Sequence, residues 1–167
     1  MIVAIDVHYK EECAKTVMLL FEHWESETPF DIIETRTKNV ADYVPGKFYE
    51  RELPCILDAL KEIDLTTIQF IVIDGYVYIN NDLEIGLGGH LYDALEKQTP
   101  IIGVAKTPFM NTKDTVVEVF RGSSQKPLYV SAIGLRKEDA AQYIKKMNGD
   151  FRLPYLLKLM DQKTKEA

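Results

Sequence analysis

Two short apolar runs constrain the fold of this 167-residue chain more than any other feature. Residues 70–73 and 101–105 hold only apolar side chains and one glycine, and they stop at Asp74 and Lys106 respectively. Uninterrupted runs of this length are typical of strands that are buried on both faces, which are usually parallel. The runs therefore predict the centre of a parallel sheet that helices cover on both sides.

An antiparallel meander is predicted before these runs. Residues 2–7, 13–22 and 32–37 are rich in β-branched and apolar side chains, and short turns separate them. Strands joined by short turns pair in antiparallel fashion. The first half of the chain should therefore add three antiparallel strands to the parallel pair, which gives a mixed five-stranded sheet.

Helices and a late hairpin are predicted around and after the apolar runs. The expected helices are residues 51–63, 84–97, 137–147 and 153–162. A hairpin is expected over residues 115–120 and 128–131. We predict an α/β fold with one domain over residues 1–162 and a flexible C-terminal tail over residues 163–167.

The composition limits the possible functions. A formal charge of −6 argues against broad electrostatic binding of nucleic acid, which depends on Lys and Arg. It leaves a nuclease open, because carboxylates that bind divalent cations raise the acidic count. No apolar stretch approaches the roughly 18 residues that span a membrane, and two cysteines are too few for a disulfide framework. We expect a cytoplasmic protein without membrane contact, and a monomer as the simplest state.

Three separated acidic residues are candidates for a shared site. Asp6 interrupts an apolar strand, Glu52 begins a helix and Asp74 ends a central strand. Each has an ordinary alternative: Asp6 as the cap of a turn, Glu52 as a complement to the helix dipole, and Asp74 as a turn former before Gly75. Their spacing matches no short metal motif, so a shared site is one hypothesis beside these three.

A shared site would suit a hard cation. Mg²⁺ prefers oxygen ligands and retains several waters, so two or three carboxylates are enough. Ligands in open α/β sheets bind outside the carboxyl ends of strands, where Asp74 is expected. In a nuclease the metal activates water, and a lysine such as Lys106 neutralises the phosphate. The alternative for Lys106 is a solvated lysine in a loop.

Several short blocks resemble one family, in order along the chain. The blocks are Ile5-Asp6-Val7-His8-Tyr9, residues 42–52, Val72-Ile73-Asp74-Gly75, residues 86–91, residues 103–107, Tyr129-Val130-Ser131, and Arg152-Leu153-Pro154 with Lys158 and Asp161. Residues 42–52 keep the Tyr, Pro, Gly, Arg and Glu of the endonuclease V signature P-Y-I-P-G-x-x-x-x-R-E. The chain thus resembles the endonuclease V family from residue 5 to residue 161, and the resemblance implies an RNase H-like fold.

The resemblance also implies roles for single residues. Asp6 and Asp74 would bind a catalytic Mg²⁺, for which Mn²⁺ can substitute. Glu52 and Asp161 would complete the acidic site, as a ligand, through water, or by orienting the nucleophile. Lys106 would stabilise the phosphate.

Residues that contact the substrate follow from the same resemblance. The loop that would wedge into a duplex beside an extruded base is Tyr43, Val44, Pro45 and Gly46. Gly75 and Gly86 would shape the pocket for that base. The alternative for the loop is an ordinary surface turn. The implied substrate is DNA that contains deoxyinosine, or RNA that contains inosine, cleaved 3′ to the modified base during repair.

The chain departs from the family pattern after Gly75. The pocket glycine of the family is Val77, its histidine falls on Asn81, and its basic pair falls on Leu83 and Glu84. Valine crowds a pocket and glutamate repels phosphate, whereas the residues that would cut the strand are all present. Three hypotheses remain open: an inosine-directed endonuclease, a nuclease with a different substrate, or a catalytically impaired relative that binds nucleic acid. We interpret His90 as a residue of helix packing.

Overall fold

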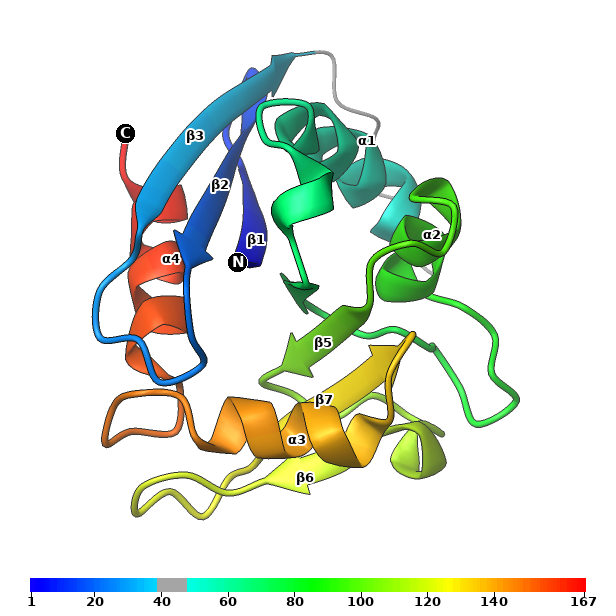
Figure 1. Ribbon diagram of the computed structural model, residues 1–167. Coiled ribbons are helices and arrows are strands. Elements are labelled where there is room, and N and C mark those ends of the chain that lie inside the picture. The colour runs from blue at the N-terminus through cyan, green and yellow to red at the C-terminus, as the bar shows by residue number, and fades with distance from the viewer. Residues whose placement is uncertain (39–47) are drawn as a thin grey trace.

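A computed structural model of the protein describes residues 1–38 and 48–167 (Figure 1). The strands are β1 (Ile2–Tyr9), β2 (Cys13–Phe21), β3 (Asp31–Lys38), β4 (Phe70–Asp74), β5 (Ile101–Ala105), β6 (Val117–Val119) and β7 (Leu128–Ile133). The helices are α1 (Phe48–Leu60), α2 (Leu87–Ala94), α3 (Lys137–Lys145) and α4 (Tyr155–Lys165). Within the described residues the strands form one mixed sheet in the order β3-β2-β1-β4-β5-β7-β6.

The predicted α/β class is confirmed, but the predicted count of five strands is wrong, because the described residues form a seven-stranded sheet. The hairpin of β6 and β7 joins the sheet, and β7 pairs antiparallel with β5 from Ile101↔Ile133 to Ala105↔Tyr129. All residues of β5 are buried. An unpaired edge on such a strand would leave backbone N–H and C=O groups buried without partners, and β7 satisfies them.

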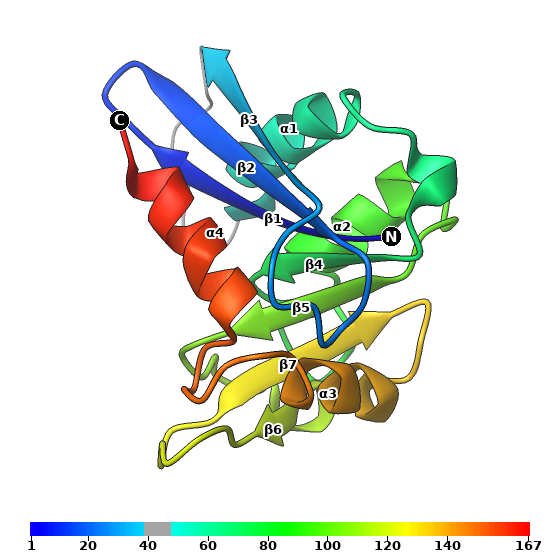
Figure 2. The ribbon, with the colours of Figure 1, turned by 60° about the vertical axis from the view of Figure 1, so that its left-hand side comes forward.

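Helices cover both faces of the sheet, and α4 crosses the face nearer the viewer in Figure 2. On that face α3 and α4 contribute Ile144, Leu157 and Met160 to a core that extends to Trp24 and β1. On the other face α1 and α2 bury a second set of apolar side chains, among them Leu91. The central strands are therefore buried on both sides, as their apolar sequences predict.

Two helix boundaries differ from the prediction in ways that affect the site. Helix α2 begins at Leu87 rather than at residue 84, because Tyr78 and Ile85 pair as an isolated bridge that closes a small hairpin. Helix α4 continues to Lys165, so the segment that we expected to be a tail begins inside a helix. No helix within the described residues is long and apolar enough to cross a membrane.

Candidate active site

The register of two parallel strands brings Asp6 and Asp74 together. Strands β1 and β4 pair from Ile2↔Phe70 to Ile5↔Ile73, so Asp6 and Asp74 occupy the next position on adjacent strands. Neighbouring strands lie about 4.8 Å apart, and side chains at matched positions point to the same face. The two carboxylates therefore lie side by side, with Asp74 at the carboxyl end of β4 and Asp6 in the interior of β1. Ligands of such sheets bind at the carboxyl ends of central strands, where Asp74 lies.

Helix α4 and the end of β5 complete the charged cluster. Asp6, Asp74, Lys106 and Asp161 line one cleft on the α4 face of the sheet. Lys106 Nζ lies 3.7 Å from Asp161 Oδ1, and Lys165 Nζ lies 3.0 Å from Asp161 Oδ2. The cleft thus combines three carboxylates with the ammonium group of Lys106, and Lys165 adds a second ammonium group through its ion pair with Asp161.

Glu52 approaches the cluster from α1. It belongs to the buried stripe of that helix, together with Cys55, Ile56 and Ala59, and only 6% of Glu52 is exposed. A carboxylate among apolar residues is costly unless another group compensates its charge. The prediction that Glu52 begins the helix is wrong, because α1 begins at Phe48 and the acidic residue of its first turn is Glu50. Helix-dipole complementarity therefore does not explain the position of Glu52, and its burial favours the acidic site.

Burial and mutual repulsion raise the pKa values of the carboxyl groups in the cluster. Burial, reinforced by Asp74 and then Asp161, raises the pKa of Asp6 from 3.8 to about 7, although Val7 N–H donates to its Oδ1 at 2.9 Å. Burial and the neighbouring Asp6 raise the pKa of Glu52 to about 8. Burial also raises the pKa of Asp74, while Lys106 lowers it. The cluster therefore favours bound protons or a cation.

The donor set fits a hard divalent cation with an incomplete protein shell. Among the described residues no three Asp, Glu, His or Cys side chains converge closely enough to form a full ligand set. Mg²⁺ does not need one, since it retains waters and takes one or two carboxylates beside substrate oxygens. Asp6 and Asp74 supply hard oxygens, and a cation between them would relieve the repulsion that raises the pKa of Asp6.

The expected substrate-contacting residues have different outcomes. Tyr43, Val44, Pro45 and Gly46 lie outside the described residues. Gly75 follows Asp74 with φ +146°, a backbone conformation that favours glycine, and its N–H donates to Val104 O. Gly86 precedes α2, and an added Cβ would lie 2.9 Å from Ile79 Cγ2. Both glycines meet steric demands of the fold, and their contact with a base stays a prediction.

Val77 fills the space beside α2. It is fully buried, and a Cβ added to Gly88 would lie 2.8 Å from Val77 Cγ2. The Val77 N–H donates to Ser131 Oγ at 3.0 Å, and its carbonyl accepts from Gly86 N–H at 2.7 Å. Val77 is therefore tightly packed within the fold, and its effect on a pocket for a base stays a prediction.

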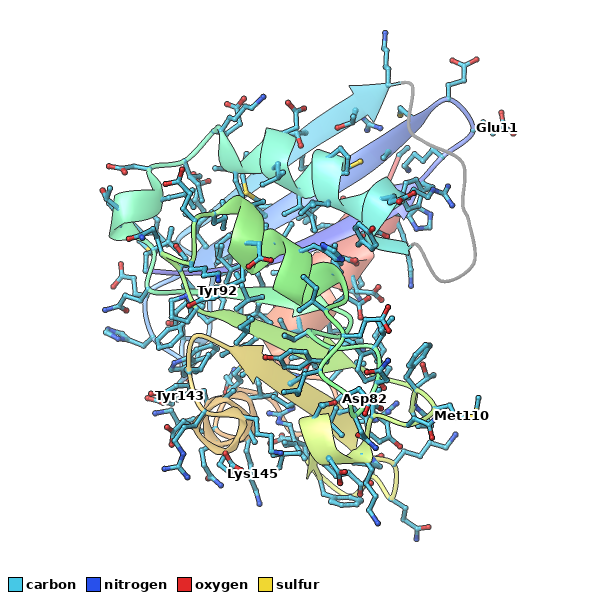
Figure 3. All side chains as sticks on the ribbon, turned by 90° about the vertical axis from the view of Figure 1, so that its right-hand side faces the viewer. Glu11, Asp82, Tyr92, Met110, Tyr143 and Lys145 are labelled. Atoms are coloured by element: carbon cyan, nitrogen blue, oxygen red, sulfur yellow. The ribbon has the colours of Figure 1, made fainter. Side chains whose placement is uncertain are left out.

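The other departures from the family pattern, Asn81, Leu83 and Glu84, add no positive charge to the hairpin before α2. Asn81 Oδ1 accepts from Asp114 N–H, and Glu84 accepts from the Asn80 amide. Leu83 is 60% exposed at the tip of the hairpin. Figure 3 shows Asp82 of the same hairpin and Met110 of the loop after β5 on one side of the molecule.

His90 joins α2 to α1. Its ring stacks on that of Tyr49 with centroids 3.6 Å apart and an interplanar angle of 17°. The contact agrees with our interpretation of His90 as a residue of helix packing.

Lys165 approaches Asp161 from the same helix and is not among the site residues predicted from the sequence. Its signal was the spacing of Asp161 and Lys165, since residues four apart lie on one face of a helix. We had placed residues 163–167 in a tail, and a lysine-rich terminus is ordinarily solvated.

The fold and the carboxylates at the strand ends define a nuclease-like α/β protein, and comparisons with known proteins agree. A family model described as Endonuclease V matches residues 1–162. Endonuclease V of Pyrococcus horikoshii is 33% identical over 167 residues, which cover 98% of this chain and 72% of that protein. Endonuclease V of Nostoc punctiforme is 31% identical over 140 residues, which cover 72% of this chain and 61% of that protein.

A solved structure shares the fold. The crystal structure of Ciona intestinalis Endonuclease V, in complex with a 24mer DNA containing an inosine followed by a ribo-adenosine, superposes with a TM-score of 0.78. The match covers 98% of this chain and 83% of that chain at 19% sequence identity. The chain therefore belongs to the endonuclease V family, and it is a nuclease of that family by homology.

Proposed function

We propose that the protein is a Mg²⁺-dependent endonuclease that hydrolyses a phosphodiester bond 3′ to deoxyinosine, inosine or another distorted base in DNA or RNA. The observation that carries this proposal is the register that aligns Asp6 with Asp74 beside the Lys106–Asp161 pair. The role would be in nucleic-acid repair in the cytoplasm, and Mn²⁺ would substitute for Mg²⁺.

The residues of the cleft would divide the chemistry among them. The metal would activate a water and stabilise the leaving oxygen. Asp6 and Asp74 would hold it, and Glu52 would complete its environment from α1 or orient the attacking water. Lys106 would neutralise charge on the phosphate, and Asp161 would keep the Lys106 ammonium group in place.

Inosine is proposed as the modified base because of a relative. The Ciona intestinalis enzyme was crystallised with DNA that contains an inosine. The fold and the acidic cleft support a related substrate for this protein. They do not distinguish DNA from RNA.

A second candidate is the same chemistry on a substrate without inosine. The packing of Val77 against Gly88 favours it, because Val77 stands where the family has a pocket glycine and its side chain fills the space beside α2. A base that stays outside the protein, in a single strand or at a mismatch, would not need that space.

Both candidates are tested by one cleavage assay. Oligonucleotides of DNA and RNA, single- and double-stranded, with inosine or with adenine at the same position, are incubated with Mg²⁺, Mn²⁺ or a chelator. Asp6→Asn and Asp74→Asn test the site, and Asp93→Asn on the exposed side of α2 is the control for an equal change of charge.

Each outcome distinguishes the hypotheses. Metal-dependent cleavage of inosine substrates, lost in the two site variants and kept in Asp93→Asn, supports the first candidate. Equal cleavage of inosine and adenine substrates supports the second. If the wild-type protein forms no more product than Asp74→Asn on any substrate, both candidates are contradicted. The remaining hypothesis is then a family relative that binds nucleic acid without cleaving it.

A further inference from the structure

Lys165 places a second ammonium group at the acidic cluster. Its Nζ lies 3.0 Å from Asp161 Oδ2, while Lys106 Nζ lies 3.7 Å from Asp161 Oδ1. One carboxylate therefore lies between two lysines that come from separate elements, the end of β5 and the last turn of α4. The hydrogen bond to Asp161, with further attraction from Asp6 and Asp74, raises the pKa of Lys165 and keeps it charged.

The last turn of α4 is anchored by a buried lysine. Lys15 of β2 is 1% exposed, and its Nζ donates to Lys163 O at 2.6 Å and to Glu166 O at 3.2 Å. Its carboxylate partner is Glu34, at 3.6 Å. Helix ends ordinarily leave carbonyl groups without partners and fray. Here a buried ammonium group satisfies them, which fixes the backbone from which Lys165 projects.

A hydroxyl group ties the same turn to the strand that bears the first acid. Thr164 is 1% exposed, and its Oγ1 lies 2.7 Å from Asp161 O and 3.5 Å from Asp6 Oδ2. The end of α4 is thus held at β1 and β2, beside the acidic cluster. Holding this turn in place has a clear use if its side chains act on a ligand in the cleft.

We propose that Lys165 is a second phosphate-binding lysine, which together with Lys106 binds a phosphodiester of the substrate strand. The inference rests on the proposed nuclease function. A cleft with three carboxylates repels phosphate, and the positions of the family's basic pair hold Leu83 and Glu84. Lys165 supplies a cation from the last turn of α4, and its side chain is 58% exposed, so it can exchange Asp161 for a phosphate.

Binding to a fluorescent oligonucleotide tests the proposal without cleavage. The protein carries Asp74→Asn throughout, and the probe is the preferred oligonucleotide of the cleavage panel or, if none is cleaved, single-stranded inosine DNA. Lys165→Gln is compared with Lys165→Arg and with Lys163→Gln. Lys163 is the matched control, because it lies on the same turn and its Nζ pairs with Glu166 rather than with the cleft.

Lys165→Gln should weaken binding roughly three- to tenfold and reduce the slope of log affinity against log salt by about one, as expected for one lost phosphate contact. Lys163→Gln should change the affinity less than about twofold, and Lys165→Arg should restore most of it, because arginine also binds phosphate. The effect of Lys165→Gln should persist when Asp161 is also changed to Asn.

Other results overturn the proposal. A merely structural Asp161–Lys165 ion pair would lower the melting temperature of Lys165→Gln but leave the salt slope equal to that of Lys163→Gln. Absence of all oligonucleotide binding would contradict it as well. Failure of the proposed nuclease function gives a different result. The wild-type protein would then cleave no substrate, while Lys165→Gln would still bind the oligonucleotide more weakly than Lys163→Gln.

Discussion

The acidic cluster and the segment that follows it are neighbours in the chain with opposite physical character. On the adjacent strands β1 and β4, Asp6 and Asp74 are partly buried close to each other, and burial raises the pKa of both. After Gly75, the backbone groups of Val77 are paired and its side chain packs tightly against Gly88. Charge repulsion therefore opposes the arrangement of the first region, whereas packing and hydrogen bonds support that of the second.

This difference shows where a ligand is needed. Like charges buried together lower the stability of a fold, and functional sites are where such arrangements persist. A cation at Asp6 and Asp74 would remove the penalty, whereas the packed segment gains nothing from a ligand. The comparison predicts that changes in the first region affect activity, and that changes in the second affect stability.

The largest effect is expected from Asp74→Asn. Removing a metal-binding carboxylate should reduce the rate of cleavage by roughly 10³-fold or more, about 4 kcal/mol of transition-state stabilisation. The folded state should remain at least as stable, because a buried charge is removed. Initial rates and a denaturant titration measure the two quantities. A variant that retains more than about a tenth of the wild-type rate would place the metal elsewhere.

Gly88→Ala should have the largest effect on stability in the packed segment. Alanine ordinarily stabilises a helix by about 1 kcal/mol relative to glycine, but here its Cβ would lie 2.8 Å from Val77 Cγ2 and 3.0 Å from Val77 Cα. We expect a net destabilisation of roughly 1–3 kcal/mol. Denaturant midpoints measure it.

A double-mutant cycle is the control for this contact. Val77→Ala alone leaves a cavity and destabilises the protein, yet in the Gly88→Ala background it removes the closest clash. The two changes together should therefore cost less than the sum of their separate effects. Simple additivity would show that Val77 does not limit the space beside α2.

The central strands and two of the acids were predictable, because local sequence decides them. Residues 70–73 and 101–105 are apolar throughout and form β4 and β5, and the ends of such strands are where Asp74 and Lys106 were expected. The alignment of Asp74 with Asp6 depends on parallel pairing of β1 and β4, and that of Lys106 depends also on parallel pairing of β4 and β5.

Long-range contacts were not predictable from the same patterns. The pairing of β7 with β5 joins residues about thirty positions apart, and no local pattern selects that edge. The role of Lys15 was equally hidden, because a lysine in an apolar strand gives no sign of which carbonyl groups its ammonium will meet. Lys165 was missed because residues 163–167 were predicted to be a tail, and the contact of Lys15 with Lys163 O joins segments 148 positions apart in the chain.

The free energy of unfolding should also depend on pH, through the carboxyl group of Asp6. The pKa of Asp6 is raised from 3.8 to about 7, so between these pH values the folded state binds more protons than the unfolded state. The free energy of unfolding of the metal-free protein should therefore fall as the pH rises from about 4 to about 7, by roughly 1–3 kcal/mol.

Asp6→Asn should remove much of that slope and should be more stable than the wild type at pH 8 without metal. Asparagine keeps the oxygen that accepts from Val7 N–H and carries no charge. Denaturation at several pH values, with and without Mg²⁺, measures the effect. An Asp6→Asn protein that is less stable than the wild type at pH 8 would show that the carboxylate is already compensated in the metal-free fold.

The smallest effect is expected from His90→Ala, which tests the packed region at its edge. The imidazole stacks on Tyr49, and loss of one such ring contact should cost about 0.5–1.5 kcal/mol. The rate of cleavage should change less than twofold if His90 only joins α1 to α2. His90→Phe keeps an aromatic ring without nitrogen atoms and should restore the stability. A large loss of rate in His90→Phe at normal stability would instead assign the imidazole to the site, and the division between a catalytic region and a packed region would then fail at α2.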